Sequence, residues 1–552
     1  MANIYDKAVV KVQKKSGFDK SFQNLFTSKV GTITPVLVDE LIPNTTVNLK
    51  MAITTQLPPL ASDTFMRVKQ KYAAFFVPTR ILMPGFENWL CGSTNSSPAG
   101  TAVKIRVPMI NTTSAKLGVG SLGDYLGFKL PSNAGANINC AINALPFLAY
   151  HKIYDDWFRN SLVQKPLFVD DVISGNVDYK ASNSNRVVPC SHSGDAFNYR
   201  INAVPGTSAP TVDTEHSPLF ADGVSILDLR QANFGTDLYT SCTPSPQNGE
   251  AQSVSFTTPA QGEDASFTIS ALRAANSIQQ FLERNNLAGN RLVDYVKAQY
   301  GANLSDAIAQ RPILIGSGSF DVYSKGVYQT AESDTTSAVT DVAYHNPFRA
   351  TPGARYGSAY VDGSDLIIKG FTAAEPGYLM VVTWLSPKVT YSTGIDPMLM
   401  RYMSSADSQS DMANPILQNV GNEPIFARQL NASQINSDAV FGYNDRYANW
   451  KDKMDEVHGI LRDGSTLQSF ALQRTFSGTV KLGSDFLKIP TNFLDQVASV
   501  GGDISKYGYW SDTYFDYKVS MPLARYSVPS LQDPAYEHGS DVVVDRGGKQ
   551  IN

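Results

Sequence analysis

One histidine and one aspartate stand at a spacing that could bind a metal. His151 and Asp155 are four positions apart in a stretch of helical periodicity, so a helix would bring both side chains to one face. The neighbouring Asp156 and Arg159 favour another interpretation, a solvated or ion-paired helix face. None of the six histidines forms an HExxH motif, so they predict no metal site. A site built from carboxylates of two chains would leave no spacing pattern, and the sequence predicts neither its presence nor its absence.

A glycine-rich stretch has the spacing of a dinucleotide-binding loop. Residues 118–123 read Gly-Val-Gly-Ser-Leu-Gly, a literal GxGxxG. A dinucleotide site needs a strand before that motif and a helix after it. Residues 111–117 make a poor strand, and Gly127 and Pro131 would break a helix, so the motif predicts a turn and no cofactor. The sequence also lacks a GxxxxGK[ST] phosphate loop and a GxSxG nucleophile elbow.

Two acidic clusters could supply the paired carboxylates of a glycosidase. One is Asp155 with Asp156, and the other is Asp452 with Asp455 and Glu456. Sequence spacing does not fix the separation of about 5 to 10 Å that this catalysis requires. Acidic clusters also usually lie in water. We therefore predict no catalytic residues, and a protein that is not an enzyme.

The first twenty residues are rich in lysine. Five lysines stand against only Asp6 and Asp19, so an N-terminal arm, residues 1–30, could touch phosphate. A solvated chain end is the alternative. The candidate DNA-facing residues are Lys7, Lys11, Lys14, Lys15 and Lys20.

The chain as a whole has no such basic excess. Its 552 residues include 46 Lys and Arg against 50 Asp and Glu, a net charge of −4, and 17% of the residues are charged, where about 25% is usual. This composition excludes a protein that binds nucleic acid through bulk positive charge. Four widely spaced cysteines without a CxxC pair predict reduced thiols, and no signal peptide or membrane span is evident. These features predict a protein made in a reducing cytoplasm.

Period-2 patterns predict strands toward both ends of the chain, and helices in the middle. Residues 47–53 alternate apolar and polar side chains, 67–77 follow a Pro-Pro break, and 377–385 are apolar on both faces, as in a buried strand. Shorter candidate strands are 253–258, 265–271 and 486–489. The predicted helices are 146–159, 272–287 and 291–300, and the polar segment 181–261 between them is typical of a surface insertion.

Distinctive sequence blocks, each different, are spread along the chain from about residue 31 to residue 476. The most specific is Leu145–Tyr154 (LPFLAYHKIY), followed by Gly120–Gly127 (GSLGDYLG). Further blocks are Gly31–Pro43, Phe75–Leu82, Glu87–Leu90, Leu272–Ala275, Gln310–Pro312 and Gly442–Tyr447. Together they resemble the major capsid protein of microviruses, small icosahedral phages with single-stranded DNA, and especially its gokushovirus-like branch. Glu375–Pro376 departs from that family, which has a Glu-His pair there.

The resemblance implies a mainly β fold, the viral eight-stranded antiparallel jelly roll, with long loop insertions and a few helices. It implies that residues 31–552 form a single capsid domain, with the insertion at about 181–261 as a candidate three-fold protrusion. Strands of about six residues would place only about 50 residues in such a barrel. The remainder would form loops that contact neighbouring subunits.

The resemblance also implies a function: self-assembly of about 60 copies into a T=1 shell around circular single-stranded DNA. The implied partners are an internal scaffolding protein, a DNA pilot protein, a small basic DNA-binding protein and a host surface receptor, without membrane insertion. The protein would reside in the virion after assembly in the bacterial host cytoplasm, and the family offers no catalytic residue or cofactor. Because each subunit carries −4, cations and basic proteins would have to neutralise most of the genome.

Two alternatives remain beside this prediction. Jelly rolls also host carbohydrate-binding and glycoside-cleaving proteins, which the carboxylate clusters and exposed Tyr or Trp would support. A tail or scaffold protein of another phage is the other alternative. For a capsid protein, we predict that removing residues 2–20 weakens genome retention more than shell closure.

Overall fold

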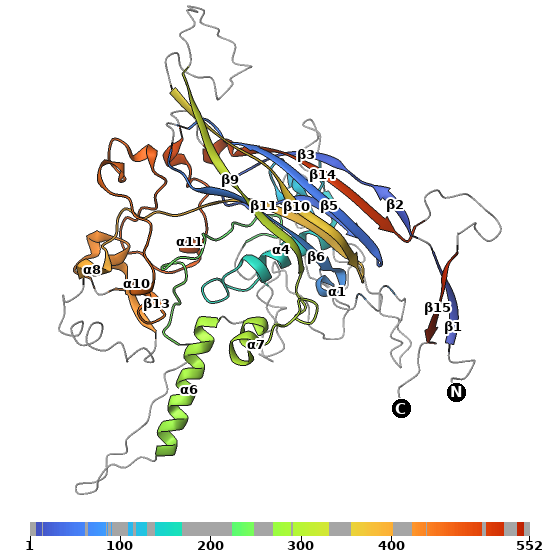
Figure 1. Cartoon of the computed structure of the whole chain (residues 1–552), viewed down its shortest axis with the longest axis horizontal. Coiled ribbons are helices and arrows are strands. Elements are labelled where there is room, and N and C mark those ends of the chain that lie inside the picture. The colour runs from blue at the N-terminus through green and yellow to red at the C-terminus, as the bar shows by residue number, and fades with distance from the viewer. Residues whose placement is uncertain are drawn as a thin grey trace, which may run out of the picture.

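The computed structural model of the chain (Figure 1) is dominated by antiparallel strands, which confirms the predicted mainly β class. One predicted strand, 253–258, lies outside the described residues. The structure describes residues 7–13, 15–60, 64–83, 86, 90, 109–113, 117–129, 139–167, 224–247, 269–288, 291–329, 355–400, 422–437, 439–498, 504–523 and 538–545.

A nine-stranded antiparallel sheet at the centre of the molecule (Figure 1) divides into two four-stranded parts, the first and second sheets, and β2 (Ser16–Asp19) adds to β14 as a ninth strand. The first sheet has the order β3 (Phe22–Ser28), β14 (Tyr509–Met521), β5 (Thr45–Gln56) and β10 (Arg355–Ala373). The second has the order β4 (Thr34–Leu41), β11 (Gly377–Pro387), β6 (Val68–Pro78) and β9 (Ile313–Gln329). Pairing of β9 with β10 joins the two sheets.

The strand pairs follow one rule. In chain order, the first of the eight strands pairs with the last (β3 with β14), the second with the seventh (β4 with β11), the third with the sixth (β5 with β10) and the fourth with the fifth (β6 with β9). A ribbon of these four pairs, rolled up so that β14 also meets β5 and β11 also meets β6, is an eight-stranded jelly roll. The strand order therefore agrees with the predicted fold.

The burial of individual strands follows their sequence patterns. On β5, Val47, Leu49 and Met51 are at most 2% exposed, whereas Asn48 and Lys50 between them are exposed, as predicted. All but one residue of β11 are buried, which confirms the strand that is apolar on both faces. The core lies between the sheets, where Phe76 of β6 packs on Phe371 of β10 with ring centroids 5.4 Å apart.

Six of the eight strands have 11 or more residues against the expected six, and β9 and β10 are the longest. β9 has 17 residues and β10 has 19. The length of β9 has a topological cause, because residues 313–322 pair with β6 in one sheet and residues 323–329 pair with β10 in the other. β10 in turn continues along β5 through two register shifts.

Two long connections carry most of the remaining elements. The β6–β9 connection contains α1 (Thr79–Leu82), β7 (Met109–Thr113), α3 (Leu122–Tyr125), β8 (Asn139–Asn143), α4 (Leu145–Ile153), the π-helix η2 (Tyr154–Phe158), α6 (Ile269–Ala288) and α7 (Leu292–Tyr300). The β11–β14 connection contains α8 (Pro397–Met400), β12 (Glu423–Phe426), η6 (Ala427–Gln429), η7 (Ala432–Gln434), β13 (Val440–Asn444), α10 (Ala448–Lys451), η8 (Gly459–Leu461), η9 (Gln468–Phe470), α11 (Ser484–Leu487), η10 (Asp495–Val497) and α12 (Ile504–Tyr507).

The three predicted helices are confirmed, and one predicted strand is wrong. Residues 146–159 form α4 and η2, 272–287 lie within α6, and 291–300 nearly coincide with α7. Residues 486–489 were expected as a strand, but Phe486 and Leu487 belong to the short helix α11. Both side chains are buried, and a short apolar run does not distinguish a buried strand from a buried helix turn. The end of the predicted strand 265–271 likewise falls in α6.

The two connections pack against each other and against the barrel. Asn233 of the first pairs with Lys488 of the second through a β-bridge, and Thr243 pairs with Tyr443 in the same way. Gly31, at the entry to β4, has a φ of 72°, and a Cβ there would lie 2.6 Å from Ile489. This contact requires glycine, because the backbone is left-handed and the second connection leaves no room for a side chain.

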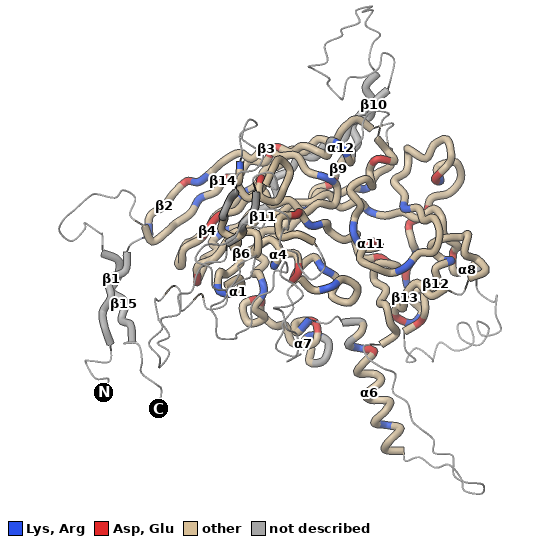
Figure 2. Tube along the Cα trace, turned by 180° about the vertical axis from the view of Figure 1, so that it is seen from behind, with Lys and Arg blue, Asp and Glu red and all other residues tan. Residues whose placement is uncertain are grey.

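The sequence predicted an N-terminal arm, residues 1–30, ahead of the capsid domain, but the structure places part of this segment in the barrel. Strands β2 (Ser16–Asp19) and β3 both pair with β14, so residues 16–28 belong to the first barrel sheet. Only β1 (Lys7–Gln13) stands apart, in a two-stranded sheet with β15 (His538–Asp545). Figure 2 shows Lys and Arg interspersed with Asp and Glu over the described elements, as the near-neutral composition predicts.

Candidate functional site

Lys20, one of the five candidate DNA-facing lysines, is bound to the barrel. Its Nζ lies 2.5 Å from Asp39 Oδ2 on β4 and 5.5 Å from the centre of the Tyr517 ring on β14. The Tyr517 hydroxyl donates to the same carboxylate oxygen at 2.7 Å. Burial, and then the charge of Asp39, raises the pKa of Tyr517. A DNA phosphate would have to compete with Asp39 for this ammonium.

Two of the other candidate lysines, Lys7 and Lys11, belong to the strand β1. In the β1–β15 sheet, Lys7 stands opposite Asp545 and Lys11 stands opposite Asp541. Lys15 Nζ donates to Thr46 Oγ1 at 3.2 Å, and Lys14 lies outside the described residues.

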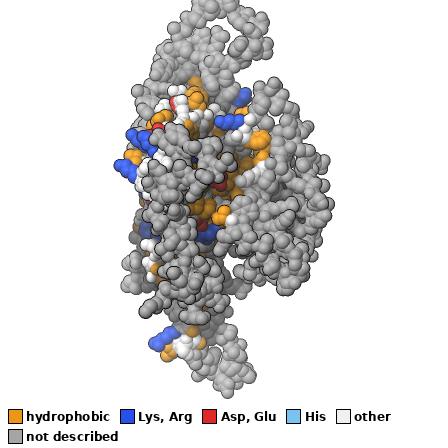
Figure 3. Space-filling model, turned by 90° about the vertical axis from the view of Figure 1, so that its right-hand side faces the viewer, with side chains coloured by type: hydrophobic (Ala, Val, Ile, Leu, Met, Phe, Trp, Pro, Cys, Tyr) orange, Lys and Arg blue, Asp and Glu red, His pale blue; other side chains and the backbone are white. Residues whose placement is uncertain are grey.

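The face of the molecule shown in Figure 3 carries basic, hydrophobic and uncharged side chains together. Figure 3 shows the described basic side chains in several separate groups, between hydrophobic and uncharged side chains. Electrostatic affinity for DNA grows with the number of phosphates contacted. A contact made by the described residues of this face would therefore be local.

His151 is a buried structural side chain rather than a metal ligand. It is 0% exposed, and its Nδ1 accepts a hydrogen bond from Arg230 Nε at 3.0 Å. Its proton must therefore reside on Nε2, which donates to the Ile226 carbonyl at 2.9 Å. Burial, and then the charge of Arg230, holds the pKa of His151 well below its usual value of 6.5. The ring is neutral, and neither nitrogen has a lone pair left for a metal.

Asp155 is ion-paired, as the alternative interpretation of this helix predicts. Its Oδ1 lies 2.6 Å from Arg159 Nε, and the two side chains are only 8% and 9% exposed, so the pair is buried rather than solvated. The same oxygen accepts from the Leu167 backbone at 3.1 Å. Burial raises the pKa of the neighbouring Asp156, and Lys152 at 3.1 Å opposes that shift. Both carboxyl groups therefore have structural partners.

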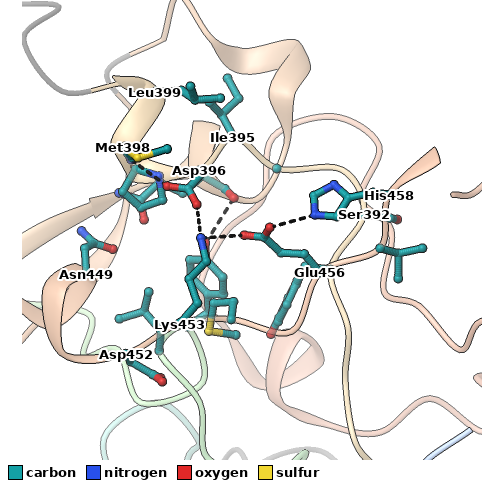
Figure 4. Close-up of a pocket in the computed structure, with 18 of the residues that line it drawn as sticks. Ser392, Ile395, Asp396, Met398, Leu399, Asn449, Asp452, Lys453, Glu456 and His458 are labelled. Atoms are coloured by element: carbon teal, nitrogen blue, oxygen red, sulfur yellow. Dashed lines mark hydrogen bonds and ion pairs between the residues drawn. The ribbon is translucent and has the colours of Figure 1, made fainter.

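The second acidic cluster borders a cavity of about 580 Å³ in the β11–β14 connection. Figure 4 shows Lys453 pointing toward both Asp396 and Glu456, and its Nζ lies 3.6 Å from Glu456. Hydrogen bonding to Asp396, and then the charge of Glu456, raises the pKa of Lys453. Glu456 also contacts His458 Nε2 at 3.2 Å. Glu456, a member of the predicted acidic cluster, is therefore ion-paired with Lys453.

The remaining members of this acidic cluster do not form a catalytic pair either. Asp455 Oδ2 lies 2.5 Å from Lys388 Nζ and 3.9 Å from Arg67. Asp452 borders the cavity with an exposed side chain. Among the described residues, no group of three or more His, Cys, Asp or Glu could hold a metal ion.

The GxGxxG stretch forms a turn, as predicted. Gly120 has a φ of 79°, and its N–H donates to Asp124 Oδ2 at 2.9 Å. Ser121 then caps the short helix α3 by accepting from the Asp124 backbone. The glycine therefore serves a left-handed turn, and no long helix follows to receive a phosphate.

The described part of the predicted insertion, residues 224–247, lies inside the molecule. Ile226, Leu227 and Ala232 are at most 3% exposed. Cys242 is a free, buried thiol, and burial raises its pKa to about 12, in line with the predicted reduced cysteines. Residues 181–223 and 248–261 lie outside the described ranges. Buried apolar residues at the centre of this otherwise polar segment therefore pack the β6–β9 connection against the rest of the molecule.

Arg474 is a key residue that the sequence did not indicate. Its guanidinium carbon lies 3.9 Å from the ring centre of Phe486, 4.6 Å from that of Phe234 and 5.1 Å from that of Phe476. It also donates to the Phe486 carbonyl, and burial lowers its pKa. Because Phe234 belongs to the first connection and the other rings to the second, this cation clamps the two together. No local motif predicts it, since the partners are far apart in sequence.

These features define a class of protein: a mainly β fold with jelly-roll strand order, whose two long connections pack against each other and whose buried charges are paired within the chain. The chain matches the family model described as "Capsid protein (F protein)" over residues 8–531, and it belongs to that family. The predicted resemblance to microvirus capsid proteins is thereby confirmed.

Three relatives support the same assignment along nearly the whole chain. Capsid protein VP1 of Chlamydia phage 1 is 24% identical, with 96% of this chain and 98% of the relative covered. Capsid protein VP1 of Bdellovibrio phage phiMH2K is 25% identical, with 94% and 95% covered. Capsid protein VP1 of Spiroplasma virus 4 is 24% identical, with 90% and 91% covered.

The chain is therefore a structural protein of the virion that self-assembles into a capsid, and not an enzyme. In the described part of the chain, no helix is both long and apolar enough to span a membrane.

Proposed function

We propose that about 60 copies of this chain close into a T=1 icosahedral shell around a circular single-stranded DNA genome. The observation that carries the proposal is the match to the capsid family over residues 8–531, which spans both barrel sheets and both long connections. The jelly-roll strand order supports it, because the barrel uses short loops at some corners and leaves two long connections for contacts with neighbours.

The net charge supports a set of partners. About 60 subunits of charge −4 have the same sign as the genome. We therefore propose that a small basic DNA-binding protein neutralises DNA in the virion. From membership of the capsid family we further propose that an internal scaffolding protein and a DNA pilot protein act during assembly in the bacterial cytoplasm. The segment 181–261, apart from its buried part 224–247, would contribute a protrusion at the three-fold axes.

Electron microscopy of the purified full-length chain, co-expressed with its scaffolding protein, tests the shell. We expect uniform closed particles of one diameter. Monomers that bind glycans would instead support the carbohydrate-binding alternative, and rods would support a tail protein. Either outcome contradicts the proposal.

The candidate DNA-facing lysines give a second prediction. Changing Lys7, Lys11, Lys14 and Lys15 to Gln should leave closed particles but lower their DNA content. For single-stranded DNA, the slope of log affinity against log salt should fall by about 3, since each phosphate contact contributes about 0.7. Lys20 stays unchanged because it pairs with Asp39.

The matched control replaces the same four lysines with Arg, which keeps the charge. We expect that variant to retain DNA like the parent chain. Substitution is sharper than removal of residues 2–20, because the deletion would also remove β2 from its pairing with β14. Normal DNA-filled particles from the Gln variant would refute a role of these lysines in genome retention.

A further inference from the structure

α6 extends away from the barrel and is fastened near its C-terminal end. Figures 1 and 2 both show the helix projecting from the body of the molecule. Residues 269–284 are exposed or half-buried, whereas Asn286 is buried and donates to Thr243 Oγ1 at 3.0 Å. Phe281 contacts Tyr295 of α7, with ring centroids 6.3 Å apart. The N-terminal half of α6 therefore has little of its surface packed.

The exposed helix is nevertheless amphipathic. At 100° per residue, six apolar residues fall within a sector about 120° wide, which we call the α6 stripe. Its members are Ala271, Ala274, Ala275, Ile278, Phe281 and Leu282. The charged residues Arg273, Glu283 and Arg284 project from the opposite side.

The centre of the α6 stripe is open to solvent. Ile278 is 44% exposed and Phe281 is 40% exposed, and Leu272 beside the stripe is 46% exposed. Most helices in proteins gain their stability by packing such a face against a partner. A 20-residue helix that leaves this face open indicates a partner outside the single chain.

The order of side-chain sizes along the stripe indicates which partner fits. The N-terminal half contains only alanines, and the C-terminal half contains Ile278, Phe281 and Leu282. Two copies of α6 in antiparallel orientation would place the large half of each against the small half of the other. In one register Ala271 faces Leu282 and Ala275 faces Ile278 of the second copy. A parallel pair would instead stack large on large and leave a gap between the alanines.

We propose that the α6 stripe packs against the α6 stripe of a second copy of this chain, antiparallel, across a two-fold axis. A two-fold contact is self-complementary, as this pattern requires. The inference rests on the proposed shell, because a helix about 30 Å long and about 10 Å wide would bury only about 600 Å² in total. A stable isolated pair needs about 1,200 Å² or more. The contact therefore acts together with the other contacts of an assembled particle.

Disulfide cross-linking in assembled particles tests this register. Particles are formed from a mixture of an Ala271→Cys chain and a Leu282→Cys chain, one carrying a tag that shifts its mass. Cysteines join when their Cα atoms lie within about 7 Å. We expect mild oxidation to link unlike chains, in up to about half of the contacts for random mixing, and to link neither variant with itself. Within one helix the two positions are about 16 Å apart, so like residues would not meet.

The matched control is a mixture of Arg273→Cys and Gln280→Cys chains. These positions occupy the same register on the opposite side of the helix, so no cross-link is expected. Particles of the parent chain, with its four native cysteines, give the background. If the stripe mixture fails to close while the control mixture closes, that result also supports burial of the stripe between copies.

Two outcomes would overturn the inference. Cross-links within particles of a single variant would show a parallel or unrelated contact. Closed particles without any cross-link in the stripe mixture would show that α6 faces something other than α6. A parent chain that forms no particles would instead contradict the proposed shell, and microscopy of the parent chain distinguishes that failure from the others.

Discussion

Replacing Arg474 by alanine is expected to lower the free energy of unfolding by about 3 to 5 kcal/mol. The guanidinium contacts three aromatic rings at 3.9 to 5.1 Å and donates to the Phe486 carbonyl. The substitution removes the attraction between cation and rings, leaves a buried carbonyl without its donor, and opens a cavity where the two connections meet. The shift of the urea unfolding midpoint of the full-length chain measures the loss.

Two further substitutions separate charge from packing. Arg474→Met keeps most of the volume without the charge, and Arg474→Lys keeps the charge without the flat guanidinium. We expect both to be destabilised, with Met closer to the parent chain than Ala. The surface control is Lys451→Ala, whose side chain is 56% exposed in an ion pair with Asp445, and it should change stability by less than about 1 kcal/mol. A Met variant as stable as the parent chain would show that the cation contributes nothing beyond its volume.

The sequence predicted those elements whose stabilising contacts are periodic and local. The alternation of Val47, Leu49 and Met51 requires one buried sheet face, and the continuous apolar run 377–385 requires two. The helix 146–159 was also predictable, because its apolar residues recur at helical spacing. These patterns depend only on side chains a few positions apart, so one chain is enough to reveal them.

The rest depends on contacts between distant residues. The lysine-rich segment 1–30 has the composition of an arm, but residues 22–28 complete a sheet whose partner strand begins at Tyr509. The polar composition of 181–261 conceals a buried centre that packs on both connections. His151 was considered with Asp155, four residues away, whereas its real partners are Ile226 and Arg230.

The same contrast applies to function. Three of the carboxylates that sequence spacing suggested for catalysis are ion-paired: Asp155 with Arg159, Asp455 with Lys388, and Glu456 with Lys453. Such pairs hold loops together, and each of these three carboxylates has a cationic partner. What remains for function is exposed surface, such as the α6 stripe, and this is the feature that a self-assembling protein needs.

Acid is expected to destabilise the chain through His151. The folded state holds this imidazole neutral because it is buried and its Nδ1 faces the Arg230 guanidinium, so its folded pKa is well below 6.5. The unfolded chain titrates near 6.5. Below that pH the unfolded state binds a proton that the folded state does not, so stability is complete above the unfolded pKa and falls as pH decreases toward the folded pKa. Between the unfolded and the folded pKa, each pH unit costs up to about 1.4 kcal/mol.

Urea unfolding midpoints measured at several pH values test this prediction against a non-titrating variant. His151→Gln keeps a donor for the Ile226 carbonyl and loses the acceptor for Arg230, so it should be less stable near neutral pH but lose less stability on acidification. The difference between the two pH profiles isolates the imidazole from the carboxylates that also titrate in acid. His458→Gln removes a histidine whose side chain is 81% exposed, and its profile should follow that of the parent chain. Equal pH profiles for the parent chain and His151→Gln would show that His151 is not the acid-sensitive group.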